Sequence, residues 1–366
     1  MESLEPPLHT GSSVVSVQEL VKETLEAVPE RYVRHDQEPQ ILSDNRSTET
    51  PIVPIIDLGK LSSDQTLGNQ ELQKLHGACK DLGIIQLVNH GIGPSLLEDL
   101  RHEIEEFFKL ALSEKEKFGR RLGEFEGYGS VPLSEVKLDW GDRFLMTVNP
   151  IAKRNPRLFP ELPLSLRNTL DSYIKEMQKL AMQLLCLISK CLEIEMNEMK
   201  ELFEDGFQIL RMTYYPPCPQ PELVVGLTPH SDSCGITILH QINNVDGFQI
   251  KKDGIWTPVH ILPDAFVVNV GDTMEILTNG LYNSIEHRAT VNSIKERISI
   301  AMFFNPKLDS EIGPIQSLMT KESPALFRRI KMEKYVNDYS SHKLDGKSYL
   351  EKLKLRTEKA VAFEVE

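Results

Sequence analysis

The chain has 366 residues, of which 40% are hydrophobic, and a formal net charge of −13. These values describe an acidic globular protein with enough apolar residues for a core, and the negative charge argues against a nucleic-acid partner. The sequence contains no run of about 18 apolar residues, so no membrane span is predicted. The start of the chain lacks the basic and apolar regions of a signal peptide. Five cysteines without a Cys-x-x-Cys pair suit a reducing compartment, so we expect a cytoplasmic protein.

The first 200 residues carry mainly helical patterns. Ser16 is a candidate cap for a helix over residues 16–28, because Glu19 follows three positions later. A polar linker then extends to about residue 50. The apolar spacing predicts strands over 53–58 and 84–88, and helices over 71–82, 94–118 and 163–192.

From Phe207 the apolar pattern changes to short runs rich in Val, Ile, Phe and Thr, which predict strands. The expected strands cover residues 207–215, 235–241, 248–251, 255–259, 265–270, 284–290 and 297–304. Asp253-Gly254 is a hairpin signal between two of these strands. Seven or eight antiparallel strands of this kind form a jelly roll, the double-stranded β-helix of cupin-like proteins. We therefore predict an α+β fold, with helices around the jelly roll and further helices over 323–339 and 348–355.

The pattern divides the chain into four regions. Residues 1–50 hold the N-terminal helix and linker, and residues 51–200 form a mainly helical region. Residues 201–310 form the jelly-roll core, and residues 311–366 hold the C-terminal helices and tail.

Two strand-like segments carry a candidate metal site. His230 and Asp232 are two positions apart at the end of a strand, so their side chains share a face. His287 lies in another strand, which a closed β-structure can bring across. Two imidazoles and one carboxylate with open positions opposite suit non-haem Fe(II) that handles oxygen. A His-x-Asp triplet alone also arises by chance, and the ordered combination is what makes the hypothesis specific.

One strand later, Arg297 and Ser299 point to a common face. The planar guanidinium can bind a carboxylate through two hydrogen bonds, and the hydroxyl can add a third. We interpret this pair as the site of an acidic organic cosubstrate. His90, in an Asn-His-Gly turn, is a further possible ligand, but a structural role is the preferred interpretation.

Several motifs around these residues resemble the plant 2-oxoglutarate- and Fe(II)-dependent dioxygenases of specialised metabolism, close to the alkaloid O-demethylases and senescence-related oxidoreductases. The matching text includes TYYPPCP, GLTPHSD, LPDAFVVNVGD, EILTNGLYNSIEHRATVN and KERISIA, with PIIDLGKL and QLVNHGI earlier and KLDGKSYL near the end. The resemblance covers roughly residues 14 to 355 and implies the jelly-roll fold.

The resemblance implies Fe(II), 2-oxoglutarate and O2 as reactants, with ascorbate keeping the iron reduced. It implies that Tyr215 adds a hydrogen bond to the cosubstrate, and that Thr213 stands where the family has Asn. The hydroxyl of Thr213 is shorter than the amide, which bears on cosubstrate affinity. The implied reaction hydroxylates or O-demethylates a hydrophobic plant metabolite, alkaloid-like or phenolic, and releases succinate and CO2.

Four further residues are substrate-contact candidates: Tyr128, Arg143, Leu145 and Phe303. Plain packing in loops, strands and core is an equal alternative for each. We expect a monomer that binds a small-molecule substrate. Two other functions stay open, namely an iron oxidase driven by ascorbate or by the substrate itself, and a non-catalytic binder of small molecules.

Overall fold

The structure is a computed structural model that describes residues 16–23, 25–37, 53–61, 65–121, 123–129, 137–340 and 345–355. The expected linker around residues 38–50 and the acidic tail lie outside the described residues.

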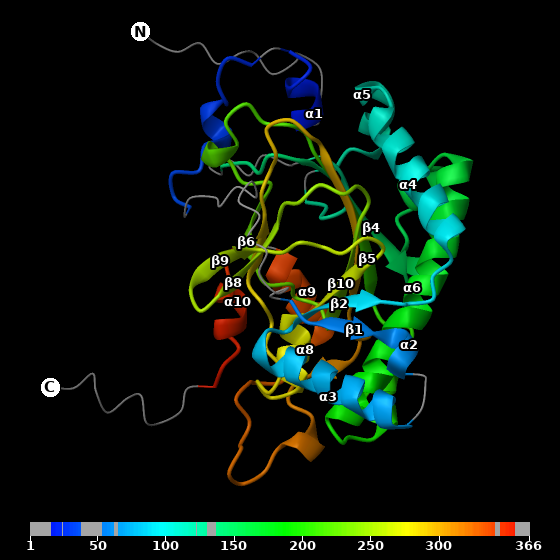
Figure 1. The fold of residues 1–366 in the computed structure, drawn as a ribbon, viewed down its shortest axis with the longest axis vertical. Helices are drawn as coiled ribbons and strands as arrows, with labels where there is room; N and C mark the ends of the chain where they lie inside the picture. Colours follow the sequence, from blue (N-terminus) through cyan, green and yellow to red (C-terminus); the bar gives the residue numbers. More distant parts are fainter. Residues whose placement is uncertain are drawn as a thin grey trace, which may run out of the picture.

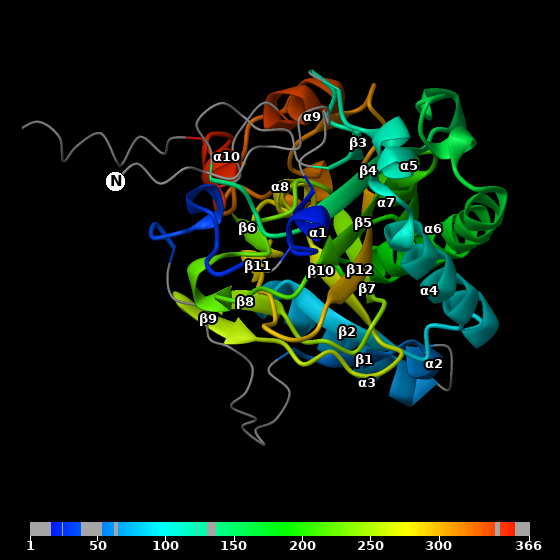
Figure 2. The ribbon, with the colours of Figure 1, turned by 90° about the horizontal axis from the view of Figure 1, so that it is seen from above.

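Two β-sheets form the centre of the protein (Figures 1 and 2). Within the described residues the larger sheet has the order β1-β2-β10-β7-β12-β5-β4-β3 and the smaller sheet the order β6-β11-β8-β9. The strands of the larger sheet are β1 (Ile55–Asp57), β2 (Ile84–Val88), β10 (Phe266–Val270), β7 (Ile236–Gln241), β12 (Arg297–Phe304), β5 (Gln208–Tyr215), β4 (Asp142–Asn149) and β3 (Gly127–Tyr128). Those of the smaller sheet are β6 (Leu227–His230), β11 (His287–Ala289), β8 (Phe248–Lys252) and β9 (Ile255–Pro258).

The strand pairs are antiparallel except for β1 and β2, which run parallel. At the predicted hairpin between β8 and β9, Asp253 and Gly254 have φ values of +50° and +80°. Both central residues of a type I′ turn need a positive φ, which explains why this dipeptide occurs there. Two largely antiparallel sheets with flanking helices confirm the predicted α+β jelly roll.

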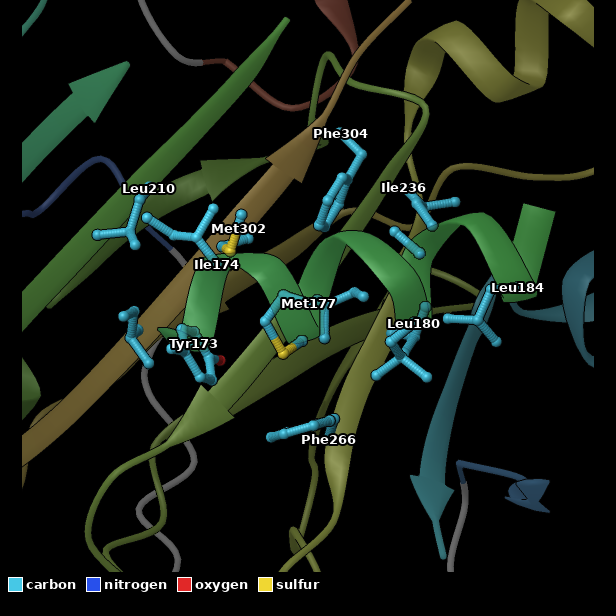
Figure 3. Packing of buried hydrophobic residues seen from close by; sticks show 14 of the residues in the cluster. Tyr173, Ile174, Met177, Leu180, Leu184, Leu210, Ile236, Phe266, Met302 and Phe304 are labelled. Atoms are coloured by element: carbon cyan, nitrogen blue, oxygen red, sulfur yellow. The ribbon is translucent and has the colours of Figure 1, made fainter. Parts of the chain in front are cut away.

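Helices cover the outer face of the larger sheet. They are α3 (Gln65–Asp81), α4 (Pro94–Lys109), α6 (Leu164–Cys191) and α7 (Met196–Phe203). Figure 3 shows the apolar stripe of α6 facing strand residues such as Ile236, Met302 and Phe304. The predictions for residues 84–88 and 163–192 are thereby confirmed, because both segments present a buried apolar pattern that tertiary contacts keep.

The alternation along the central strands separates core from site. On β12, Ile298, Ile300, Met302 and Phe304 belong to the core cluster under α6, and the intervening residues 297, 299, 301 and 303 face the smaller sheet. β4 and β5 alternate in the same way, and their register with β12 aligns the inward residues in rows. The same core also contains residues of α3 and α4, so the segments before and after residue 200 share one hydrophobic interior. The predicted region boundaries stay predictions.

Short elements complete the fold. They are α1 (Val17–Leu20), α2 (Leu58–Leu61), α5 (Leu112–Lys115), α8 (Asp272–Leu277), β13 (Glu311–Ile312), β14 (Ile330–Lys331), α9 (Met332–Ser340) and α10 (Ser348–Glu351). Among the described helices, none is long and apolar enough to cross a membrane.

Several helix predictions were wrong in extent. The helix expected over 71–82 begins at Gln65, and the one expected over 348–355 ends at Glu351. The Ser16 cap is present, with Oγ accepting from the Glu19 N–H, but α1 ends at Leu20 because Val28 and Tyr32 leave the helical path to pack beside Trp140. The helix expected over 94–118 ends at Lys109, and a 3-10 turn then carries Phe118 into the core. Of residues 323–339, only those from Met332 onward are helical.

Candidate metal centre and cosubstrate site

Strand pairing brings the two predicted imidazoles together. β11 lies antiparallel beside β6, and His287 is the direct partner of His230 in the register. Their ring centroids are 4.4 Å apart. Asp232 follows two residues after the end of β6, where the chain still holds its carboxylate beside both rings.

The three side chains converge on one point. The His230 Nε2 to Asp232 Oδ1 distance is 3.4 Å, and the His287 Nε2 to Asp232 Oδ1 distance is 3.8 Å. All three residues are buried, and their ligand atoms lie within 4.8 Å of one another. They form the one such group of His, Cys, Asp or Glu within the described residues.

Hydrogen bonds orient each donor toward that point. Nδ1 of His230 faces the Thr228 carbonyl at 2.8 Å, and Nδ1 of His287 faces the Ile285 carbonyl at 3.1 Å. A ring nitrogen next to a carbonyl carries the proton, so each Nε2 presents its lone pair. Thr237 and Asn269 donate to Oδ2 of Asp232 at 2.6 and 2.8 Å, which leaves Oδ1 to face the imidazoles.

The protonation states of these side chains and one unpaired ring nitrogen also fit a metal ion. Burial opposes ionisation of Asp232, but the adjacent imidazoles of His287 and His230 hold the pKa of its carboxyl well below the ordinary range. Burial lowers the pKa of His287 to about 4, which keeps this imidazole neutral near pH 7. Nε2 of His230 is buried without a hydrogen-bond partner in the described structure. A buried orphan acceptor is costly, and a divalent cation at this point would satisfy it.

A cationic group lies in the same cavity. Asp232, His287, Arg297 and Ser299 all line it, together with Tyr215. Arg297 is buried, donates from Nε to Gln241 Oε1 at 3.3 Å, and lies 5.3 Å from the centroid of the Tyr215 ring. Its Nη2 has no partner among the described residues. Desolvation lowers the pKa of the guanidinium from its ordinary value. A buried arginine with a free donor that lines a cavity suits a carboxylate ligand.

Thr213 occupies the row next to this cavity. It pairs with Ser299 on one side and with Arg143 on the other, and it is buried. It lies on the inward face of β5, two residues before Tyr215, and its part in cosubstrate binding stays a prediction. It is not among the residues that line the cavity itself.

The substrate-contact candidates separate by the face of the sheet. Arg143 and Leu145 alternate inward on β4, and Phe303 alternates inward on β12 with the Arg211 guanidinium 5.0 Å from its ring centroid. Tyr128 pairs with Phe144 and lies on the opposite face, fully buried.

The prediction that Tyr128 contacts the substrate is therefore wrong. Its ring packs against Phe107 and Phe144, and its hydroxyl donates to Asp142 Oδ2 at 2.7 Å. A residue enclosed in this way does not reach a substrate. The equal alternative, packing within the core, describes it.

His90 has structural contacts. Its Nε2 lies 2.9 Å from the Asp264 carbonyl, its Nδ1 accepts from the Ile92 N–H, and its ring stacks on Phe266 with centroids 4.1 Å apart. Both ring nitrogens are occupied away from the cavity, in agreement with the preferred interpretation.

The sequence reasoning missed the residues that support the site. Thr237, Asn269 and Gln241 each bind one of the functional side chains. Asn269 carried a usable signal, because a lone amide inside the apolar run Phe266–Val270 needs a buried partner. Arg211 also lines the cavity, and its position at i−4 from Tyr215 on the same face was another signal.

Comparisons with known proteins agree with this geometry. Residues 206–306 match the 2OG-Fe(II) oxygenase superfamily, and residues 53–162 match the family described as non-haem dioxygenase in morphine synthesis N-terminal. The chain is 49% identical to codeine O-demethylase of Papaver somniferum, over 95% of this chain and 98% of that protein. It is 50% identical to protein SRG1 of Arabidopsis thaliana, over 93% and 96%. It is 46% identical to oxoglutarate-dependent flavonoid 7-O-demethylase 1 of Ocimum basilicum, over 94% and 91%.

A solved structure shares the whole architecture. The crystal structure of JOX2 in complex with 2OG, Fe and JA superimposes with a TM-score of 0.83 at 34% identity, covering 94% of this chain and 98% of that one. The similarity spans both sheets and the helical region rather than the metal-site motif alone. The chain belongs to the 2OG-Fe(II) oxygenase superfamily.

Proposed function

We propose that His230, Asp232 and His287 are the iron ligands of this dioxygenase. The observation that carries the proposal is the convergence of two imidazole nitrogens and one carboxylate oxygen, all buried and within 4.8 Å. The donor set suits Fe(II), because two nitrogens and one oxygen on one face leave positions for cosubstrate and oxygen.

The carboxylate of 2-oxoglutarate that lies farther from the 2-oxo group is proposed to bind Arg297 and Ser299. Both line the cavity that also holds Asp232 and His287, and the guanidinium has a free donor. Tyr215 and Thr213 adjoin this pair on the neighbouring strand and complete the proposed cosubstrate site. Gln241 holds the Arg297 side chain through its Nε, and Nη2 of the guanidinium stays available.

When bound, iron and 2-oxoglutarate supply the oxidising chemistry, with succinate and CO2 as products. The chain's residues orient these groups and exclude water. Thr237 and Asn269 keep Asp232 in one orientation, and the carbonyls at Thr228 and Ile285 keep both imidazoles in the binding tautomer.

The proposed substrate is a hydrophobic plant metabolite, alkaloid-like or phenolic, that is hydroxylated or O-demethylated. Support comes from relatives whose names specify O-demethylation of codeine, of thebaine and of flavonoids. Arg143, Leu145 and Phe303 face the inner side of the sheet and are the proposed contacts. We further propose a cytoplasmic monomer that uses ascorbate to keep its iron reduced.

The test is an anaerobic titration followed by turnover. Fe(II) with 2-oxoglutarate should give a weak visible charge-transfer band in the folded protein. Incubation with O2, 2-oxoglutarate and a plant metabolite extract should then give succinate, together with a product that has gained oxygen or lost CH2 by mass spectrometry. Turnover without succinate would identify an oxidase driven by ascorbate or substrate. The absence of both the band and turnover would refute the proposal and favour a non-catalytic binder of small molecules.

A further inference from the structure

Ser231, the residue between the two proposed ligands His230 and Asp232, is held at every polar group. Its N–H donates to the Gly346 carbonyl at 3.2 Å, and its carbonyl accepts from the Tyr339 hydroxyl at 3.1 Å. Its Oγ donates to Asp272 Oδ2 at 3.0 Å. Ser231 itself is buried. A triplet fixed at its middle residue cannot shift without breaking one of these three bonds.

Two of these three partners come from the C-terminal part of the chain. Tyr339 lies in α9, and Gly346 forms a parallel bridge with His230 and donates to the Pro229 carbonyl at 3.2 Å. β6 is the edge strand of the smaller sheet. An edge strand leaves backbone groups unpaired, and residues 345 to 347 occupy that edge where it carries the imidazole. Figure 2 shows α9 and α10 on the side of the molecule where β6 lies.

Lys347 anchors the same segment to the approach of the second imidazole. Its Nζ donates to Glu275 Oε2 at 2.7 Å, to Asn283 Oδ1 at 3.1 Å and to the Ser284 carbonyl at 3.0 Å. Ser284 stands three residues before His287, and its Oγ donates to Asp272 Oδ1 at 2.6 Å. Asp272 therefore links the Ser231 and Ser284 hydroxyls, so the segments that carry both histidines share one polar network.

Backbone geometry at Gly346 suits this contact. Its φ is +49°, and a Cβ built there would lie 3.3 Å from Glu286 Oε2, beside His287. A side chain would meet both the left-handed backbone and the neighbour of a proposed ligand. Glycine lets the segment approach β6 closely.

We propose that the C-terminal segment, residues 332–340 and 345–347, is a positioning element of the metal centre, with Tyr339 and Gly346 fixing Ser231 and thereby His230 and Asp232. The inference rests on the proposed iron ligands. It adds a dependence that the matched superfamily region, which ends at residue 306, does not contain.

The test uses paired variants and Co(II) as the probe. Tyr339→Phe removes the hydroxyl that binds the Ser231 carbonyl. Tyr349→Phe is its control, because the Tyr349 ring packs against the Tyr339 ring while the Tyr349 hydroxyl donates to Asp338. Gly346→Ala perturbs the bridge, and Gly254→Ala is its control, because Gly254 has φ +80° and open space around a Cβ. Co(II) affinity, the Co(II) absorption spectrum and the melting temperature of the metal-free protein are measured for each.

We expect Tyr339→Phe and Gly346→Ala to weaken Co(II) binding about tenfold and to alter the absorption spectrum, as changes behind metal ligands do. Both controls should bind Co(II) like the wild type, and Tyr339→Phe should melt within a few degrees of Tyr349→Phe. Wild-type affinity and spectrum in Tyr339→Phe would overturn the proposal, even if Gly346→Ala fails to fold. If Asp232→Ala binds Co(II) like the wild type, the ligand assignment itself fails, which is a separate outcome.

Discussion

At the residue scale, the proposed ligands and His90 predict opposite consequences of truncation. Asp232→Ala removes the anionic metal ligand and leaves two neutral imidazoles, so metal binding and turnover should be lost. His90→Ala removes a ring that stacks on Phe266 and bonds the Asp264 carbonyl. It should retain metal binding and lower the free energy of unfolding by about 1–2 kcal/mol. Metal titration and urea unfolding on both variants check this, and equal metal loss in both would overturn the assignment.

Arg297→Lys separates the cosubstrate role from the metal role. The lysine keeps the charge but loses the planar fork that holds a carboxylate at two points. We expect the dissociation constant for 2-oxoglutarate to rise roughly 10- to 100-fold, a difference of about 1.4–2.8 kcal/mol, while metal affinity stays at the wild-type value. Anaerobic titration of the Fe(II) protein with 2-oxoglutarate measures the change. Unchanged cosubstrate affinity would show that the carboxylate binds elsewhere.

The sequence identified the chemistry at this scale better than the supports around it. Residue type and spacing predicted that the side chains of His230, Asp232 and His287 meet, as they do in the structure, and their role as iron ligands stays a prediction. Tyr128 could not be assigned in this way. Whether it faces core or cavity depends on its register with Phe144 on β4, and register is a tertiary property that a two-residue strand does not encode.

At the element scale, the N-terminal segment is fastened by one buried carboxylate. Asp142 accepts from Ser16 Oγ at 2.5 Å, from the Val17 N–H at 2.7 Å and from the Tyr128 hydroxyl at 2.7 Å. Lys115, also buried, donates to Gln18 Oε1 at 2.6 Å. These bonds hold α1 where the apolar side chains that follow it pack beside Trp140 and Tyr215.

Asp142→Asn should release this segment. The amide presents donors where the wild-type carboxylate only accepts, so at least one charged hydrogen bond is lost and two donors face each other. We expect about 2 kcal/mol less stability and faster limited proteolysis before residue 37. Ser16→Ala removes one bond and the cap, and should cost about 1 kcal/mol. Wild-type proteolysis in Asp142→Asn would show that apolar packing alone docks the segment.

Element existence was predictable where local pattern and tertiary packing agree, as in β2 and α6. The failures lie where packing overrides the local period. Residues 16–28 have helical spacing, yet α1 is four residues long, because burial of Val28 and Tyr32 requires the chain to turn. β4 carries inward Arg143 and Thr147 beside outward Phe144 and Met146, and the charged start of this run hid its strand period.

At the scale of the whole molecule, one sheet serves two purposes through its two faces. The outer face of the larger sheet is sealed by α6 and its neighbours (Figure 3). The inner face carries arginine side chains and side-chain hydroxyls, including that of Ser299. Rigid packing on one side therefore fixes the positions of polar groups on the other, which is what a preorganised site requires.

The sealed face contains a buried histidine that makes stability depend on pH. His240 on β7 is buried between Tyr173 and Phe266, with ring centroids 6.3 and 5.1 Å away. Its Nδ1 has no hydrogen-bond partner in the described structure. Burial, with a smaller contribution from His90, lowers the pKa of His240 to about 4.

The native state therefore keeps His240 neutral in a range where the unfolded chain binds a proton. The folded pKa lies below the unfolded value, so the unfolded state gains protons first and stability is lost as pH falls from about 6.5 to 4. At pH 5 the loss from this group is about 2 kcal/mol. His240→Phe keeps a ring in the same space and should recover most of that loss in metal-free protein, where His287 acts equally in both chains. Urea unfolding at pH 7 and pH 5 measures the difference, with the exposed His102→Gln as control. Equal acid losses in wild type and His240→Phe would mean that His240 is protonated in the folded protein, or that another group governs the transition.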